Sequence, residues 1–329
     1  MTGLQVAPPS KLPRRGEVRD TSRQPDDLVL YSVTTCLGVL EKPALVPWAV
    51  NVTADRVVER FRLLQRRLEE EGPESAVKYV RDLRWDNGGN LSDAALGTLA
   101  HKLFDTYALD GRRPAVTADL HPDFASKGKL LTDEDVRAVS RMLDQFDRFL
   151  QTFQPDYLGC ETVVYHSTYG YGGQADAWLS IDGVRLIADY KTSRTSYTAA
   201  GKEKAPYPEA GLQLAAYRYA EAAAIWRARR YSASGNGNRS RRYYLLNEDE
   251  RAAAVPVPEV DGGVVIHVSP DRFGVYPARC GEREHAAFLY TLECARWLFN
   301  EAGNVIGDEM AAPYPLPETG DPFAGLPTD

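Results

Sequence analysis

The sequence lacks the long apolar run that a membrane-spanning helix requires. No stretch approaches the ~20 apolar residues that cross a bilayer. The N-terminal stretch MTGLQVAPPSKLPRRG has no apolar core of the kind found in signal peptides. We therefore expect no membrane partner and a cytoplasmic location.

Three motifs of common enzymes are also missing from the sequence. Without a G-x-x-x-x-G-K-S/T phosphate loop the chain holds no ATP-driven motor. The absence of G-x-S-x-G and of C-x-x-C removes serine hydrolases and simple zinc sites. The four cysteines (Cys36, Cys160, Cys280 and Cys294) are widely scattered, which predicts free thiols in a reducing compartment.

The overall charge excludes one class of nucleic-acid-binding protein. A net charge of −7 over 329 residues argues against a protein that coats DNA non-specifically. It leaves open a protein that binds DNA through the local field of a groove. The length allows one large domain or two small ones.

The stretch 174–191 (QADAWLSIDGVRLIADYK) predicts a β-hairpin. Asp182 and Gly183 stand between two alternating runs, which is a strong signal for a two-residue turn. If Ile181 pairs with Val184, this register also determines each cross-strand pair farther from the turn. One face of this hairpin is apolar enough to pack on a helix.

On this register Asp176 lies opposite Asp189, and Gln174 lies opposite Lys191. Like charges directly across two strands destabilise a sheet by a few tenths to ~1 kcal/mol. A bound divalent cation offsets such repulsion, and oxygen-rich ligand sets suit Mg or Mn. Lys191 projects from the same face as Asp189. The alternative interpretation is a solvated outer face with scattered charges.

Three segments follow one another along the chain: Gly173-Gln174-Ala175-Asp176, Asp189-Tyr190-Lys191-Thr192 and Gln213-Leu214-Ala215-Ala216-Tyr217. Together they resemble the signature of RecB-like exonucleases of the PD-(D/E)XK nuclease superfamily. The resemblance implies an α/β fold with a restriction-endonuclease-like core. That core is a mixed central β-sheet flanked by helices, preceded here by an N-terminal helical region.

Ser92 or Asp93 is predicted to cap a helix in which Gly97 and His101 lie one turn apart. A lone helical histidine is more often a packed or surface residue than a ligand. RecB-like nucleases carry a G-x-x-x-H helix before the sheet, however, and its histidine binds the metal. The resemblance therefore favours His101 as a ligand.

The resemblance implies a full set of site residues. One or two Mg or Mn ions would be held by Asp176, Asp189, His101 and the carbonyl of Tyr190. Lys191 would position the attacking water or neutralise developing charge, with Gln213 and Tyr217 facing the metal centre or the strand being cut. Glu161 is either a further acidic ligand or a surface charge at a strand end. Some relatives also hold an iron–sulfur cluster through one early cysteine and a tight C-terminal cysteine trio. Only Cys280 and Cys294 lie late in this sequence, and they are far apart, so no cluster is expected.

Two basic segments are candidate DNA contacts. The polar loop 192–208 contains Arg194, Lys202 and Lys204 and is placed to approach phosphates. The segment 227–242 (RARRYSASGNGNRSRR) holds six arginines and no acid, among them Arg239, Arg241 and Arg242. Such runs are usually solvated faces or flexible tips, but a phosphate-contacting role is favoured beside a nuclease groove.

The sequence divides into four predicted regions. They are a disordered arm (1–28), a helical region carrying His101 (29–152), the nuclease core (153–302) and a proline-rich, acidic, disordered tail (303–329). Within the helical region, Thr53 is predicted to cap a helix that runs to Gly72, and Thr132 caps a later one.

The predicted function is a metal-dependent DNA exonuclease in recombination, repair or phage DNA processing, within a bacterial or phage-infected cell. Lacking a motor, it would take loose ends or depend on a separate helicase or single-strand annealing protein. One alternative is a structure-specific or nicking endonuclease of the same fold. The other is a catalytically silent DNA-binding or assembly module.

Overall fold

The computed structural model describes residues 26–40, 42, 45–83, 85–198, 201–224, 229–234 and 240–306. Most of the predicted N-terminal arm and most of the predicted C-terminal tail lie outside these residues. Arg239 lies outside them as well. None of the helices in the described ranges combines the length and apolarity that a bilayer crossing requires.

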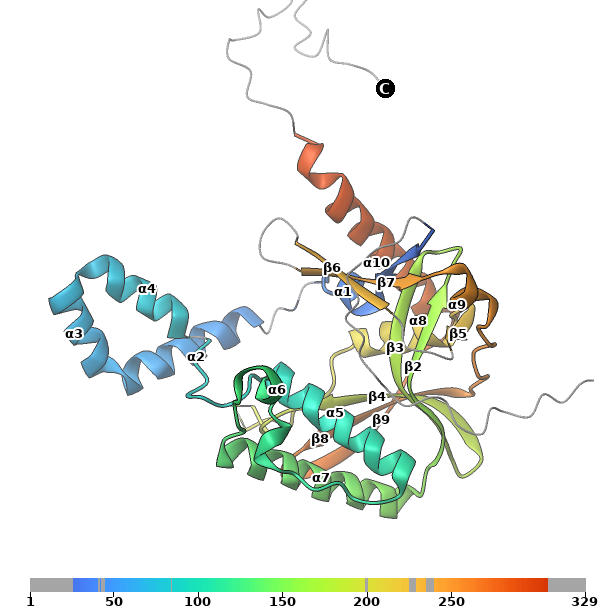
Figure 1. Cartoon of the computed structure of the whole chain (residues 1–329), viewed down its shortest axis with the longest axis horizontal. Helices are drawn as coiled ribbons and strands as arrows, with labels where there is room; N and C mark the ends of the chain where they lie inside the picture. The colour runs from blue at the N-terminus through green and yellow to red at the C-terminus, as the bar shows by residue number, and fades with distance from the viewer. Residues whose placement is uncertain are drawn as a thin grey trace, which may run out of the picture.

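Nine strands of the described chain form one mixed β-sheet (Figure 1). They are β1 (Leu28–Ser32), β2 (Asp156–His166), β3 (Tyr171–Ile181), β4 (Val184–Thr192), β5 (Ala222–Ala224), β6 (Arg229–Ser234), β7 (Ser240–Leu246), β8 (Gly262–Ser269) and β9 (Arg272–Ala278). The order across the sheet is β6-β7-β1-β3-β4-β8-β9, and β2 pairs with β3 and β5 off this path. The β1–β3 and β4–β8 pairs are parallel and the others antiparallel. The predicted mixed α/β fold class is confirmed.

Helices cover both faces of this sheet. The α-helices are α1 (Val33–Leu37), α2 (Leu45–Glu59), α3 (Phe61–Glu71), α4 (Pro73–Leu83), α5 (Asp93–Asp110), α6 (Phe124–Lys127), α7 (Asp133–Phe153), α8 (Glu209–Arg218), α9 (Glu248–Ala252) and α10 (Glu282–Asn300). Ala177 and Ala188 pack with apolar residues of α5 and α7. Their strand neighbours Trp178 and Ile187 pack with α8 and α10. Because side chains alternate along a strand, these two clusters lie on opposite faces.

Helices α5 and α7 start where capping residues predict them to start. The Ser92 hydroxyl accepts a hydrogen bond from the Ala95 N–H at 3.2 Å, at the N-terminus of α5. The Thr132 hydroxyl accepts one from the Asp135 N–H at 3.1 Å, at the N-terminus of α7. Each side chain satisfies an N–H group that the helix itself leaves unpaired.

Helices α2, α3 and α4 form a unit that stands away from the sheet (Figure 1). The prediction that Thr53 caps a helix was wrong, because α2 begins at Leu45 and Thr53 lies inside it. The Thr53 hydroxyl instead donates to the carbonyl of Ala49, one turn earlier, at 2.8 Å. Arg60 interrupts the predicted single helix, which is therefore split into α2 and α3. The range predicted to be helical also contains β1, which lies in the sheet between β7 and β3.

The hairpin between β3 and β4 has the predicted turn but not the full predicted pairing. Asp182 and Gly183 have φ angles of 49° and 81°, as a tight turn between twisted strands requires. Ile181 pairs with Val184 as predicted, and pairing continues as far as Ala177 with Ala188. Beyond that point the two strands separate, so Gln174 does not pair with Lys191.

One glycine of β3 is required by the packing of α8. A Cβ atom added to Gly173 would lie 2.3 Å from a ring carbon of Tyr217, whose side chain is almost fully buried. We expect Gly173→Ala to lower the free energy of unfolding by about 1–3 kcal/mol, the usual cost of overpacking a core. Urea unfolding monitored by circular dichroism measures this change.

Gly303→Ala is the matched control, because a Cβ there meets no atom within 4 Å. An unfolding midpoint for Gly173→Ala equal to that of the control would contradict the proposed close contact.

Candidate active site

The sheet divides in two beside Asp176. On one edge of β3, β1 pairs at Tyr171 and Gly172, whereas β4 pairs from Ala177 onwards. Residues 173–176 have neither strand beside them on that edge. The Asp176 carboxylate lies at the end of this gap, where its Oδ2 accepts a hydrogen bond from the Tyr190 N–H at 2.7 Å. A side chain therefore replaces the ladder hydrogen bond that the separated strands no longer make.

Asp189 and Lys191 lie on β4 just beyond the point where the strands separate. Asp189 is only 2 % exposed. The Lys191 Nζ lies 2.7 Å from Asp189 Oδ1 and 2.5 Å from Oδ2. The contact to Oδ2 falls outside hydrogen-bond geometry, so this buried oxygen has no hydrogen-bond donor. Its negative charge is met by the Lys191 ammonium through an ion pair.

Helix α8 brings Gln213 and Tyr217 to the same lysine. Lys191 Nζ donates to Gln213 Oε1 at 3.4 Å, and Gln213 Nε2 donates to the Tyr217 hydroxyl at 3.3 Å. One turn separates the two α8 residues, so both face β4. The predicted residues Asp189, Lys191, Gln213 and Tyr217 therefore form one continuous chain of contacts.

His101 approaches from the opposite face of the sheet. Its Nδ1 lies 3.8 Å from Asp176 Oδ2. Its ring stands edge-on to the ring of Tyr190, with centroids 5.8 Å apart. A Cβ added to Gly97, one turn earlier on α5, would lie 2.7 Å from Thr192 Oγ1. The missing side chain allows α5 to lie this close to the end of β4.

Glu161 adds a third carboxylate to the row across β2, β3 and β4. Cys160 pairs with Ala177 and Thr162 with Ala175, which places Glu161 opposite Asp176. Glu161 has a φ angle of 50°, a conformation that costs a non-glycine residue of order 1–3 kcal/mol. Gln174 holds it there, donating through Nε2 to the Glu161 carboxylate and, at 3.2 Å, to its carbonyl. No pattern in the sequence indicated this role of Gln174.

Negative charge exceeds positive charge among these buried groups, and their pKa values are shifted accordingly. Burial, and next the neighbouring Asp189, raise the pKa of Asp176 well above its usual range. Burial also raises the pKa of Asp189, although Lys191 opposes it. For Lys191, burial would lower the pKa, but Asp189 and Asp176 outweigh burial and raise it. A cation beside the two carboxylates would favour their charged forms.

The residues at this position fit a divalent metal ion. Within the described ranges, no three His, Cys, Asp or Glu side chains already form a metal-binding cluster. Two carboxylates and an imidazole nevertheless converge, and Asp189 Oδ2 has no hydrogen-bond donor. The 3.8 Å between His101 Nδ1 and Asp176 Oδ2 is too long for a hydrogen bond. It is within the ~4.2 Å that two ligands of one ion, each ~2.1 Å from it, can span. A role for the Tyr190 carbonyl stays a prediction.

The predicted DNA-binding side chains come from two separate segments. Arg194 is engaged within the protein, with its guanidinium 3.0 Å from Asp93 and 2.8 Å from the buried Asp135. It also donates to the carbonyl of Leu91. Lys204 donates to the Thr195 hydroxyl at 2.6 Å, and Lys202 is exposed.

The arginine-rich segment forms β6 and β7. The side chain of Arg241 is outside what the structure describes, whereas that of Arg242 is exposed. The Arg242 N–H donates to the Thr35 hydroxyl at 3.3 Å. Phosphate contacts from either segment remain predictions.

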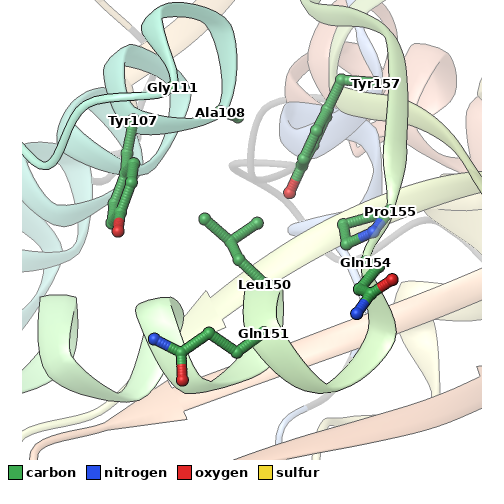
Figure 2. Close-up of a pocket in the computed structure, with 8 residues that line it drawn as sticks. All are labelled: Tyr107, Ala108, Gly111, Leu150, Gln151, Gln154, Pro155 and Tyr157. Carbon is green, nitrogen blue, oxygen red and sulfur yellow. The ribbon is translucent and has the colours of Figure 1, made fainter.

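A separate hollow of about 330 Å³ lies on the α5–α7 side (Figure 2). It lies between the C-terminal ends of α5 and α7 and the start of β2, and the rings of Tyr107 and Tyr157 stand on opposite sides of it. The Tyr157 hydroxyl is hydrogen-bonded to the Tyr190 hydroxyl at 2.8 Å. This bond fixes the ring of Tyr190, the residue between Asp189 and Lys191, on the α5–α7 side of the sheet.

One comparison with known proteins identifies a family for this chain. A family model described as "PD-(D/E)XK nuclease superfamily" matches residues 76–298, well over half of the chain. A solved structure titled "Crystal structure of SSO0001" is similar with 15% identity and a TM-score of 0.26, covering 62% of this chain and 86% of that chain. That likeness is too remote to bear on fold or function. No curated protein matches the chain.

The ion pair between Arg194 and Asp135 holds the chain after β4 on the N-terminus of α7, and Asp93 adds a contact with the N-terminus of α5. Because Asp135 is fully buried, Arg194→Met leaves an uncompensated buried charge, and we expect a loss of about 3–5 kcal/mol in unfolding free energy. Urea unfolding provides the measurement.

The double variant Arg194→Met with Asp135→Leu removes both charges and should recover part of this loss, since it also removes the acceptor of the Leu91 N–H. A single variant as stable as the wild type would show that the pair does not hold this junction.

Proposed function

The chain belongs to the PD-(D/E)XK nuclease superfamily, and from this premise we propose that it is a divalent-metal-dependent DNA exonuclease of the RecB-like group. The observation that carries the proposal is the arrangement of Asp176, Asp189 and Lys191 where β3 and β4 separate. Two buried carboxylates can hold a divalent metal ion, and an ammonium beside them can stabilise charge on a scissile phosphate.

His101, Asp176 and Asp189 would hold the metal, and Glu161, opposite Asp176 on β2, would add a fourth ligand directly or through water. A bound Mg or Mn ion supplies Lewis acidity toward the scissile phosphate and the attacking water. The carboxylates are fixed before substrate arrives, because Asp176 is anchored to the Tyr190 N–H and Asp189 to Lys191. Such preorganised groups need no rearrangement during the reaction.

Lys191 is the residue that acts on the reacting groups. Its ammonium is held by Asp189 on one side and by Gln213 on the other. From there it would position the attacking water or neutralise charge on the phosphate. Tyr217 orients the Gln213 amide and so fixes the position of the lysine.

The restriction-endonuclease-like fold also accommodates an endonuclease that nicks or recognises a structure. Exonuclease action on free ends is favoured by the RecB-like motif order and by the absence of a motor sequence. A separate helicase or a single-strand annealing protein would then deliver the ends. We place the activity in recombination, repair or phage DNA processing.

A silent DNA-binding module is the third interpretation. It is disfavoured because the three motif residues are present and also in contact through Tyr190, Lys191 and Gln213. A scaffold with no reaction to perform has no reason to bury like charges side by side.

Incubation with linear and closed circular DNA separates these interpretations. We expect Mn²⁺ to support degradation of linear DNA only, and EDTA to stop it. Nicking of closed circles would instead establish the endonuclease, and no cutting with any metal would establish the silent module. End-labelled linear DNA gives the polarity of cleavage in the same experiment.

Replacing the lysine separates chemistry from binding. We expect Lys191→Ala to bind end-labelled DNA normally but to cut it at least about a hundredfold more slowly, since a lost preorganised charge raises the barrier by ~3 kcal/mol. Lys129→Ala, an exposed surface lysine, is the matched control. Cleavage by Lys191→Ala at the wild-type rate would remove this residue from the mechanism.

Metal binding can be measured without any cleavage. We expect Mn²⁺ at about 100 times its dissociation constant to stabilise the wild type by about 2.7 kcal/mol. Thermal unfolding with Mn²⁺ or EDTA measures the increment. Asp189→Asn should abolish it, whereas Asp55→Asn, on the exposed surface of α2, should not. An equal increment in Asp189→Asn would place the ion elsewhere.

A further inference from the structure

We propose that Tyr197 and Tyr207 form a stacking surface for unpaired bases, so that the strand entering the site is single-stranded DNA. The identity of the ligand rests on the proposed nuclease function. Both tyrosines lie in the segment that joins Lys191 to Gln213, and they are 55% and 52% exposed. Aromatic rings next to a phosphate-cleaving site are the usual platform for single-stranded nucleic acid.

Tyr197 is held in a small hairpin that is anchored to the sheet. It pairs with Glu203, and the Ser196 hydroxyl is hydrogen-bonded to the Ser269 hydroxyl at 2.8 Å. The Glu203 carboxylate accepts a hydrogen bond from the Tyr276 hydroxyl at 2.9 Å and pairs with Arg272. Tyr197 is therefore an exposed ring on a fixed base.

This hairpin contacts the face of the sheet that carries Lys191. Lys191 pairs with His267 on β8, and His267 pairs with Gly274 on β9, so all three positions share one face. The ring of Tyr276 covers Gly274, where an added Cβ would lie 2.7 Å from it.

Gly274 lies two strands away from Lys191, or about two spacings of ~4.8 Å. The hydrogen bond from the Tyr276 hydroxyl to Glu203 therefore lies about this far from Lys191, because Tyr276 covers Gly274. That distance, about 10 Å, corresponds to roughly three stacked nucleotides at ~3.4 Å each.

Tyr207 lies near the other end of the segment, just before the helix that contacts Lys191. It stands two residues before the start of α8 at Glu209. Gln213, which contacts Lys191 at 3.4 Å, lies four residues further along that helix, or about 6 Å of helical rise. The two tyrosines thus lie on the segment that connects the lysine of the site to its glutamine, one nearer each of these residues.

Single-stranded DNA fits these rings better than duplex DNA. An exposed tyrosine stacks on the face of a base, and base pairing within a duplex hides those faces. Stacking is also suited to a chain with a net charge of −7, which weakens attraction to phosphates. Lys202 is exposed between the two tyrosines in sequence and can contact a phosphate.

The test measures binding in a background that does not cut. Lys191→Ala protein is titrated, by fluorescence anisotropy, into a labelled oligothymidylate and into a labelled blunt duplex. Adding Tyr197→Ala or Tyr207→Ala should weaken oligothymidylate binding about tenfold. It should leave duplex binding and the salt dependence of binding unchanged. Tyr197→Phe should bind as the parent does, because the ring is retained.

Tyr290→Ala is the control, since Tyr290 is a still more exposed tyrosine, 76% exposed, on α10. Unchanged oligothymidylate binding in both alanine variants, or equal weakening of the duplex, would overturn the proposal. Wild-type cleavage assays keep the two proposals distinguishable. Tyrosine-dependent binding without cleavage of any DNA would refute only the nuclease, and cleavage with tyrosine-independent binding would refute only the stacking surface.

Discussion

The repulsion between two buried carboxylates organises this site. Asp176 and Asp189 would lie directly opposite each other if β3 and β4 stayed paired beyond Ala177 and Ala188. The strands instead separate just before that pair, after Ala177 and Ala188, and the Asp176 side chain takes the Tyr190 N–H that a strand would have used. The sheet thus gives up ladder hydrogen bonds at this place, and the two acids are left facing a shared position. Lys191 compensates some of their charge, and a divalent cation would compensate the rest.

The rest of the fold keeps this position fixed from both faces. On one side, Gly97 allows α5 to approach the end of β4, which brings His101 to Asp176. On the other side, α8 presents Gln213 to Lys191. Arg194, two residues after the end of β4, forms ion pairs with Asp93 and Asp135 in the first turns of α5 and α7. Because the like charges repel each other, the surrounding helices and strands must hold the carboxylates in position.

The sequence allowed the residues of the site to be predicted better than the geometry that joins them. The turn at Asp182 and Gly183 follows from local backbone preferences, and with it the neighbouring strand pairs. The separation of β3 and β4 could not be predicted from local backbone preferences. It depends on β1, which pairs with β3, and on β8, which pairs with β4, and both come from distant regions of the chain. The left-handed backbone of Glu161 is held by tertiary contacts and leaves no mark in composition. Arg194 shows a related limit, since a basic residue in a loop near phosphates looks the same in sequence whether or not a buried acid engages it.

The central claim is that the gap between β3 and β4 is a cation site, and anomalous diffraction from crystals grown with Mn²⁺ tests it most directly. The account predicts a manganese peak within coordinating distance of both Asp176 and Asp189, with the His101 imidazole on the same ion. A peak bound elsewhere, or well-ordered carboxylates with no ion between them in crystals of an enzyme that Mn²⁺ activates, would contradict it.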